Sequence, residues 1–553
     1  MKYIKVLLIC TLFFPFWSCS KFLDYNEATY YKQGDVFSSL SRTEYLLTNI
    51  YSYLPTGYDA IDGAMRSSAT DDAMHVLDLS AINKLNDGSW SPIQLIDNMW
   101  GRWYNGIREA NLFIEAIKGN EFKDIQYNDN YKELMIQYHL YSYEARFLRA
   151  FFYFELIKRY GDVPLILTVP TVQEANNVTR TPYDKVVEFI VSECDEINNA
   201  LPLSFTSIPG SETGRATKGA ALALKARSLL YAASPLHNPT NDKSKWIAAA
   251  LAAKAIIDIH AYSLENDYTN IVNNIVSPEL IYETRQDASN SFERSNFPIG
   301  FEGGNTGTCP TQNLVDAYEM QATGKAISEV GSNYNPADPY VGRDPRMAKT
   351  ILYNGAIWKD SIIQCWYGGR NGLPTYKATK TGYYLKKYVM ESISLIPVST
   401  TTKKHIWVLF RSGEVLLNYA EAMNEAYGPY SLGQGTLQMT AFEAVNLIRV
   451  RAKMPDFPVG MSKEAFMNKL RNERRVELAF EDHRFWDIRR WKIGNSTTDI
   501  YGVDVTKNVT GTMSYTRKQV EKRVWNEKMN LYPISQNELF LNKNLTQNPG
   551  WEK

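Results

Sequence analysis

Apolar residues recur every three or four positions along much of this chain, the spacing that places side chains on one face of a helix. Trp100, Trp103 and Ile107 begin one such series, and proline or glycine stops several of the others. The pattern predicts helices over residues 41–53, 100–118, 141–160, 182–200, 217–233, 244–259, 414–426 and 441–452. A further helix is expected to begin at Ser462. The chain is therefore predicted to be mostly α-helical.

Several of these helices come in pairs. The segments 217–233 and 244–259 are rich in alanine, which allows two helix backbones to approach closely. A second pair, 414–426 with 441–452, fits a helical-hairpin repeat better than the first, which is longer than the usual 34-residue unit. We expect a tetratricopeptide-like scaffold formed by residues 41–260 and 410–492.

The helical spacing fades between residues 261 and 409. Gly, Pro, Asn and Tyr become frequent there, with only short strand-like runs such as 383–385 and 406–410. A second irregular segment covers residues 57–97. Binding residues concentrate on long loops held by a rigid scaffold, so we expect these two segments to form a ligand face. Residues 493–553 are expected to form a C-terminal segment of the same domain.

The stretch 472–491 reads N-E-R-R-V-E-L-A-F-E-D-H-R-F-W-D-I-R-R-W and mixes apolar residues with arginines and acids in almost equal number. Nucleic-acid binding requires unbalanced positive charge, which this stretch lacks. Spacing predicts three ion pairs along a helix: Arg474 with Glu477, Glu481 with Arg484, and Asp487 with Arg490. We therefore predict a structural role for this stretch.

Composition supports a neutral and aromatic-rich protein. The 553 residues contain 60 basic and 60 acidic side chains, which argues against a polyanionic partner for the chain as a whole. Aromatic residues reach 13%, including 36 Tyr and 12 Trp. Aromatic faces pack in protein cores and also offer flat surfaces to sugar rings.

The N-terminus predicts export and lipid anchoring. Lys2 and Lys5 precede an apolar run, residues 6–17, that is too short to span a bilayer. The run ends at Ser18-Cys19, as in a bacterial lipoprotein signal. We expect a signal peptide over 1–18, lipidation of Cys19, a tether over 19–40 and one domain over 41–553. The spacing of Cys194, Cys309 and Cys365 leaves open whether any two of them form a disulfide.

The stretch 472–491 resembles the C-terminal signature of SusD/RagB proteins, which are outer-membrane glycan-binding lipoproteins. Four more segments resemble that family in the same order: the start at Cys19 and residues 145–165, 214–227 and 531–551. The resemblance implies a mostly helical fold with tetratricopeptide-like hairpins and a loop-rich ligand face. It also implies a location on the outer membrane facing the cell exterior, and a SusC-type, TonB-dependent transporter as the partner that receives oligosaccharide.

Glycan binding needs flat apolar faces for the C–H surface of a sugar and polar groups for its hydroxyls. The turn-rich run Trp366-Tyr367-Gly368-Gly369-Arg370 offers both kinds of group. The candidate ligand-binding residues are Trp366, Tyr367, Arg370, Trp358, Trp90, Asp72 and His75. Four other tryptophans lie at helical spacing and are expected in the core: Trp100, Trp103, Trp486 and Trp491.

Two alternative functions remain open at this level. A glycoside hydrolase needs two carboxylates that face each other, one of them with a raised pKa. The adjacent pairs Asp71/Asp72 and Glu481/Asp482 do not suit that geometry, and we predict no catalytic residues. A peptide-binding receptor of the same uptake system would also use aromatic loops. The chain has no H-E-x-x-H, phosphate-binding loop or G-x-S-x-G motif, and we expect neither a metal nor a cofactor.

Overall fold

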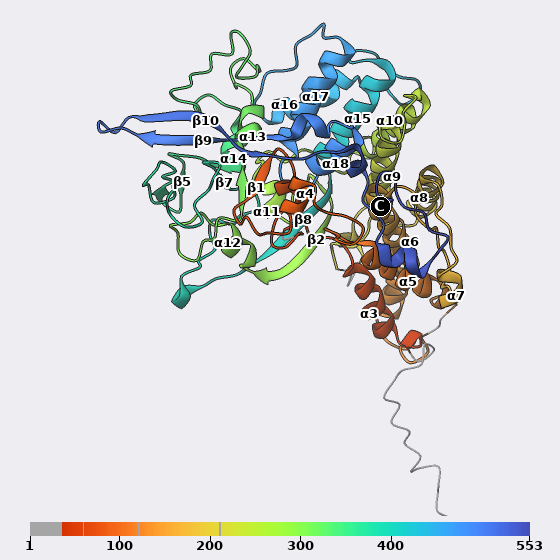
Figure 1. Ribbon diagram of the computed structural model, residues 1–553. Helices are drawn as coiled ribbons and strands as arrows, with labels where there is room; N and C mark the ends of the chain where they lie inside the picture. The colour runs from red at the N-terminus through yellow and green to blue at the C-terminus, as the bar shows by residue number, and fades with distance from the viewer. Residues whose placement is uncertain (1–35, 59, 120–121, 209–211, 553) are drawn as a thin grey trace, which may run out of the picture.

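The computed structural model describes residues 36–58, 60–119, 122–208 and 212–552. The predicted signal peptide, Cys19 and most of the predicted tether lie outside these residues. Helices dominate, as predicted, and gather on one side of the molecule (Figure 1). The longer ones are α3 (Leu40–Tyr51), α5 (Trp100–Ala116), α6 (Tyr131–Tyr160), α8 (Tyr183–Ile197), α9 (Lys218–Ala233), α10 (Lys243–Ile257), α15 (Ser412–Tyr427), α16 (Ala441–Arg451) and α17 (Lys463–Glu477).

These helices stack into one continuous layer. Helix α5 packs against α6, α6 against α8, α8 against α9 and α9 against α10. The layer then passes from α10 to α15, which also contacts α16 and α17. Small side chains allow this close approach, since Ala249 and Ala253 of α10 and Ala420 and Ala422 of α15 are all buried. The two helical blocks predicted from the sequence therefore form one hairpin-based scaffold.

Two antiparallel strands close the base of the loop-rich insertion. Strand β2 (Leu280–Ser289) pairs with β8 (Lys403–Arg411), with Glu283 opposite Val408. The insertion thus leaves and re-enters the scaffold at one place. Most of it consists of loops with short elements: α11 (Asn270–Asn273), α12 (Ser291–Asn296), β3 (Thr308–Pro310), α13 (Gln312–Ala317), α14 (Pro345–Thr350), β4 (Ile351–Leu352), β5 (Ile357–Trp358), β6 (Ser361–Ile362) and β7 (Tyr384–Leu385).

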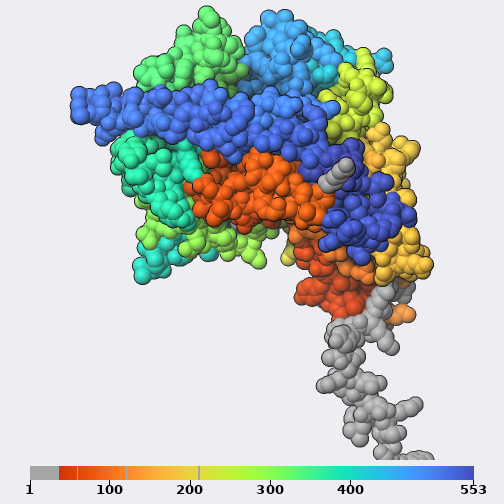
Figure 2. Space-filling view, viewed as in Figure 1, coloured from red at the N-terminus to blue at the C-terminus, as the bar shows by residue number. Residues whose placement is uncertain are grey.

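The irregular segment 57–97 and the C-terminal segment lie against each other (Figure 2). The first contains β1 (Ala73–His75), which pairs with β3, and α4 (Asn83–Asp87). The second contains an antiparallel hairpin of β9 (Asp499–Lys507) and β10 (Met513–Lys522), which the sequence analysis did not predict. The inner half of β9 is buried, whereas the turn at residues 508–512 stands clear of the body (Figures 1 and 2).

The stretch 472–491 is two helices rather than one. Helix α17 ends at Glu477 and α18 covers Arg484–Arg490. Between them the backbone turns, and Phe480 and Asp482 adopt positive φ angles of 63° and 65°. Trp486 is buried, as are Trp100, Trp103 and Trp491, so all four tryptophans expected in the core lie there.

One of the three ion pairs predicted from spacing forms. Asp487 and Arg490 do pair, with 2.7 Å between Oδ1 and Nε. The other two pairs do not form, because their members meet residues that are distant in sequence: Arg474 pairs with Asp487, Glu481 with Arg411, and Arg484 with Asp71.

A buried network of charges surrounds Glu477 and confirms that the stretch is structural. Glu477 accepts hydrogen bonds from Arg346 and Arg411, each at 2.8 Å, and from Arg451. Burial alone would raise the pKa of this carboxyl group, but the three guanidinium groups outweigh it and hold the pKa well below its ordinary value. Since Arg346, Arg411 and Arg451 come from α14, β8 and α16, one ionised carboxylate joins the insertion to the scaffold. Cys194, Cys309 and Cys365 are buried free thiols, so none of them forms a disulfide in this structure.

Candidate ligand-binding surface

Two of the three tryptophans predicted to bind ligand, Trp90 and Trp358, are buried. Trp90 is 2% exposed and packs edge-on against Tyr532 and Trp551, with ring centroids 5.2 and 4.7 Å apart. Trp358 is 1% exposed and lies 5.7 Å from the ring of Phe297. The structure therefore places both rings in the interior rather than on an open surface. The C-terminal segment provides the cover for Trp90, which the local sequence around that residue does not reveal.

The two polar residues predicted in segment 57–97 are also buried. Oδ1 of Asp72 accepts a hydrogen bond of 2.6 Å from Nε of Arg475 in α17. His75 lies in β1, and its Nδ1 accepts a hydrogen bond of 3.3 Å from the amide of Leu77. Burial lowers the pKa of His75. These positions suit the internal support of segment 57–97 and not direct contact with a ligand at the surface.

The remaining three candidates, Trp366, Tyr367 and Arg370, lie together on one loop, residues 362–378, which we call the aromatic loop. Tyr367 is 71% exposed and Tyr376, which was not among the candidates, is 79% exposed. Trp366 is half-buried and packs against the hydrophobic core. The aromatic loop thus offers tyrosine rings to solvent while its tryptophan ties it to the protein.

Backbone hydrogen bonds give the aromatic loop a defined shape. The amide of Gly368 donates to the carbonyl of Leu373 at 2.7 Å, which closes a tight turn. Asn371 fixes the turn from below, since its Oδ1 accepts from the amide of Gln364 at 2.9 Å and its Nδ2 donates to the carbonyl of Ile299 at 2.5 Å. A Cβ atom at Gly372 would lie 2.0 Å from the carbonyl oxygen of Trp366, so only glycine fits there.

Cationic side chains accompany the rings. Nζ of Lys507, at the end of β9, lies 4.8 Å from the ring centroid of Trp366. The guanidinium group of Arg370 lies 4.6 Å from the ring centroid of Phe301 and donates to the carbonyl of Ile362 at 3.2 Å. Phe301 and Lys507 come from other parts of the chain, so their place beside the aromatic loop was not readable from its sequence. Residues 362–378 contain no aspartate or glutamate. The loop therefore combines stacking faces with hydrogen-bond donors and has no carboxylate for acid–base chemistry.

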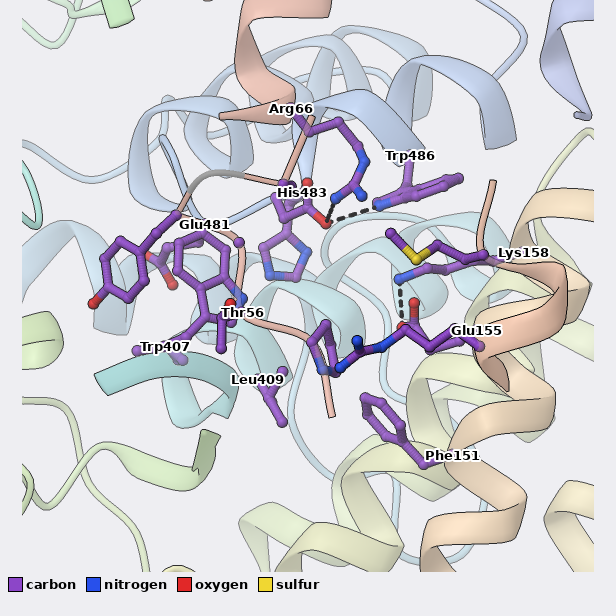
Figure 3. Close-up of a pocket in the computed structure, with 18 of the residues that line it drawn as sticks. Thr56, Arg66, Phe151, Glu155, Lys158, Trp407, Leu409, Glu481, His483 and Trp486 are labelled. Atoms are coloured by element: carbon purple, nitrogen blue, oxygen red, sulfur yellow. Dashed lines mark hydrogen bonds and ion pairs between the residues drawn. The ribbon is translucent and has the colours of Figure 1, made fainter. Parts of the chain in front are cut away.

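Apart from the aromatic loop, the protein has a recess between the helical layer and the β2–β8 pair (Figure 3). Its volume is about 330 Å³, and several of its charged groups form ion pairs. Nζ of Lys158 lies 2.5 Å from Glu155, and Arg66 lies 2.6 Å from Asp482, which also accepts from Nε1 of Trp486 (Figure 3).

Two buried glutamates of this recess lack the raised pKa that a general acid requires. Burial alone would raise the pKa of Glu155, but Lys158 and Arg159 outweigh it and lower the pKa to about 2. Arg411 and Lys387 likewise outweigh burial and lower the pKa of Glu481. Burial raises the pKa of Asp72, but that carboxyl group is enclosed and bonded to Arg475. None of these three carboxyl groups therefore provides a raised-pKa acid opposite a second carboxylate in an open site.

The described part of the chain contains no cluster of three or more His, Cys, Asp or Glu side chains suited to hold a metal ion. None of the helices in the described ranges has the length and apolar character needed to cross a membrane.

Known protein families and their members match nearly the whole chain. Residues 278–551 match the model of the SusD family, and residues 21–230 match a model described as starch-binding associating with outer membrane. SusD-like protein P25 of Formosa agariphila is 24% identical over 530 residues, which cover 89% of this chain and 90% of that protein.

Solved structures agree. A SusD-like protein from Bacteroides fragilis superposes with a TM-score of 0.77 at 26% identity, covering 93% of this chain and 98% of that one. A SusD-like carbohydrate-binding protein from the same species gives a TM-score of 0.75 at 26% identity, covering 92% and 100%. The fold, the two family models and these relatives confirm the resemblance found in the sequence: the chain belongs to the SusD/RagB family.

Proposed function

We propose that this protein is a non-catalytic glycan-binding lipoprotein of the outer membrane, anchored through Cys19 and exposed at the cell surface. It delivers oligosaccharide to a SusC-type, TonB-dependent transporter. The observation that carries this proposal is the aromatic loop, which presents Tyr367 and Tyr376 to solvent beside Trp366 and Arg370. A structural neighbour described as carbohydrate-binding and a family model described as starch-binding support the same class of ligand.

The chemistry of the aromatic loop suits a sugar chain. The C–H faces of a pyranose ring are apolar and pack on aromatic rings, while its hydroxyls accept hydrogen bonds from guanidinium and ammonium groups. The turn around Gly368 and Asn371 orders the loop before any ligand arrives. Pre-ordering reduces the conformational entropy lost on binding and so favours affinity.

Uptake of this kind needs no bond cleavage by the binding protein. The energy for import comes from the transporter, so the lipoprotein has only to bind, release and move. The absence of acidic side chains from residues 362–378 agrees with a role in binding. Aromatic and cationic side chains also suit peptides, and a peptide ligand is therefore the competing outcome in the experiment below.

Affinity electrophoresis of residues 20–553 against plant, fungal and host polysaccharides tests the proposal. We expect one class of glycan to retard the protein without release of new reducing ends. Binding of a peptide mixture, with no glycan retarding the protein, would overturn the glycan assignment. Reducing-end release by the purified protein would overturn the non-catalytic one.

The Trp366→Ala, Tyr367→Ala and Tyr376→Ala variants locate the site. We expect each lost ring that contacts the glycan to weaken binding by about 1–3 kcal/mol, the scale measured for bases stacked on aromatic side chains. Tyr127→Ala is the matched control, because Tyr127 is 90% exposed and lies between α5 and α6, outside the aromatic loop. Full affinity in all three folded loop variants would move the site elsewhere.

A further inference from the structure

Five lysines line one pocket in the loop-rich half of the protein. The pocket has a volume of about 520 Å³ and lies between α11, residues 386–392 and the start of β8. The lysines are Lys349, Lys386, Lys387, Lys403 and Lys404, and the one acidic residue in the lining is Glu391. Acidic and basic residues are equal in number over the whole chain, so this local excess of positive charge is a feature of the fold.

Three of these lysines form no ion pair with an acidic residue of the described ranges. Lys349 pairs with Asp267, and Lys387 pairs with Glu481, each at 2.5 Å. By contrast, Nζ of Lys386 donates to the carbonyl of Ala348 at 2.9 Å, and Nζ of Lys403 donates to the hydroxyl of Ser392 at 2.7 Å.

Lys404 is exposed and takes part in no ion pair with a described residue. Glu391 is also exposed, and its carboxylate accepts from the amide of Lys359. Even with Glu391 counted against them, Lys386, Lys403 and Lys404 give the lining of the pocket net positive charge. A ligand with negative charge would neutralise it.

The pocket lining also contains a buried hydrogen-bond donor without an acceptor. Nε1 of Trp358 has no hydrogen-bond partner among the described residues, and the side chain is 1% exposed. Buried polar groups are nearly always paired, so this donor leaves the wall of the pocket incompletely satisfied.

We infer that this pocket binds an acidic sugar unit, with the oxyanion facing Lys386, Lys403 and Lys404. The inference rests on the proposed glycan-binding function and names the class of glycan as anionic. A pocket of about 520 Å³ falls in the size range of small-molecule sites. The shared chemistry is a negatively charged oxygen group on a sugar ring, supplied either by the carboxylate of a uronic acid or by a sulfate ester.

Matched glycans that differ only in charge test this inference. Isothermal titration calorimetry compares oligogalacturonate with its carboxyl-reduced form, and a sulfated galactan oligosaccharide with its desulfated form. We expect one charged member to bind at least about tenfold more tightly than its neutral match, the scale of a charged hydrogen bond. The pair that shows this difference in affinity identifies whether the charged group of the ligand is a carboxylate or a sulfate. Raising the NaCl concentration from about 50 mM to about 500 mM should weaken the binding of the charged ligand and leave that of the neutral ligand unchanged.

The triple variant Lys386→Gln, Lys403→Gln, Lys404→Gln removes the unpaired charges. We expect it to bind the charged glycan no more tightly than the neutral match. The control variant Lys118→Gln, Lys132→Gln, Lys543→Gln removes the same charge from exposed lysines outside the pocket and should keep the preference. Circular dichroism and thermal melting verify that both variants fold.

The outcomes separate this inference from the proposed function. Equal affinity for charged and neutral glycans, or equal loss of preference in the two triple variants, overturns the inferred site for an acidic sugar and leaves glycan binding intact. Failure of every glycan to bind overturns both. Two results together support a glycan that contacts both the pocket and the aromatic loop. The pocket variant alone loses the preference for charge, and Tyr367→Ala weakens the binding of both the charged and the neutral glycan.

Discussion

Arg411 illustrates how single residues hold this fold together. It is buried and contacts three glutamates: Glu279, Glu477 at 2.8 Å and Glu481 at 2.7 Å. Transfer of such charges from water is costly, and their attraction repays that cost only when each has its partners. The network therefore specifies which segments meet, since any other arrangement leaves a buried charge unpaired.

We predict that Arg411→Met lowers the free energy of unfolding by about 3–5 kcal/mol, because it removes a cation that three buried glutamates share. Urea denaturation followed by tryptophan fluorescence measures the change. Arg517→Ala is the control, since the Arg517–Asp316 pair is half-exposed and such pairs contribute about 0–1 kcal/mol. Equal loss in the two variants would contradict the network's role.

Acid should destabilise the protein through carboxylates whose pKa is depressed in the folded state. Arg475 and Arg484 outweigh burial and lower the pKa of Asp71 to about 2, and Lys158 and Arg159 do the same for Glu155. Such groups stabilise the fold above their unfolded pKa, near 4, and lose that contribution as pH falls through about 2. We predict that the melting temperature drops between about pH 4.5 and pH 2.

Asp71→Asn supplies the comparison for this pH profile. The amide cannot titrate, so the variant should be less stable at neutral pH and should lose less additional stability as the pH falls. Differential scanning calorimetry at several pH values measures both effects. A profile parallel to that of the wild type would show that Asp71 does not contribute to the acid transition.

At the scale of elements, the ends of helices depend on single backbone positions. Helix α6 is followed by Gly161, whose φ of 69° is unfavourable for residues with a Cβ atom. A Cβ there would also lie 3.1 Å from a methyl group of Leu531, in the C-terminal segment. The glycine thus allows the longest helix to stop where that segment crosses it.

We predict that Gly161→Ala lowers the free energy of unfolding by about 1–3 kcal/mol, the cost of a strained backbone position. Gly101→Ala is the matched control, because Gly101 lies in the first turn of α5 with open space around it. Replacing that glycine should stabilise the protein by up to about 1 kcal/mol. Thermal melting of both variants measures the difference, and a stabilising Gly161→Ala would contradict the backbone argument.

At the scale of the whole molecule, segments distant in sequence make one interior. The main hydrophobic cluster includes residues from Phe37 to Trp551, so the insertion and the scaffold share a core. The α10–α15 contact joins the helical blocks, and the β2–β8 pair closes the insertion between them. The aromatic loop, through Trp366, and the lysine pocket, through Trp358, pack on this same core.

Local spacing was enough to predict the helical scaffold. Helix contacts form between residues three and four apart, so α5, α9 and α16 could be read from their own residues. The long strand β2 and the β9–β10 hairpin were missed. Strands pair with other segments and do not follow the three- and four-residue spacing of a helix. The five motif segments, taken in order, identified the family.

The sequence alone thus determined the helical class, the family and one loop rich in aromatic residues. Only the tertiary structure decided which rings face solvent, because burial depends on segments far along the chain. The C-terminal segment covers Trp90, and Phe297 packs against Trp358, whereas Tyr367 and Tyr376 stay open. The lysine pocket likewise combines residues from α14, residues 386–392 and β8, whose charges meet only in the folded protein.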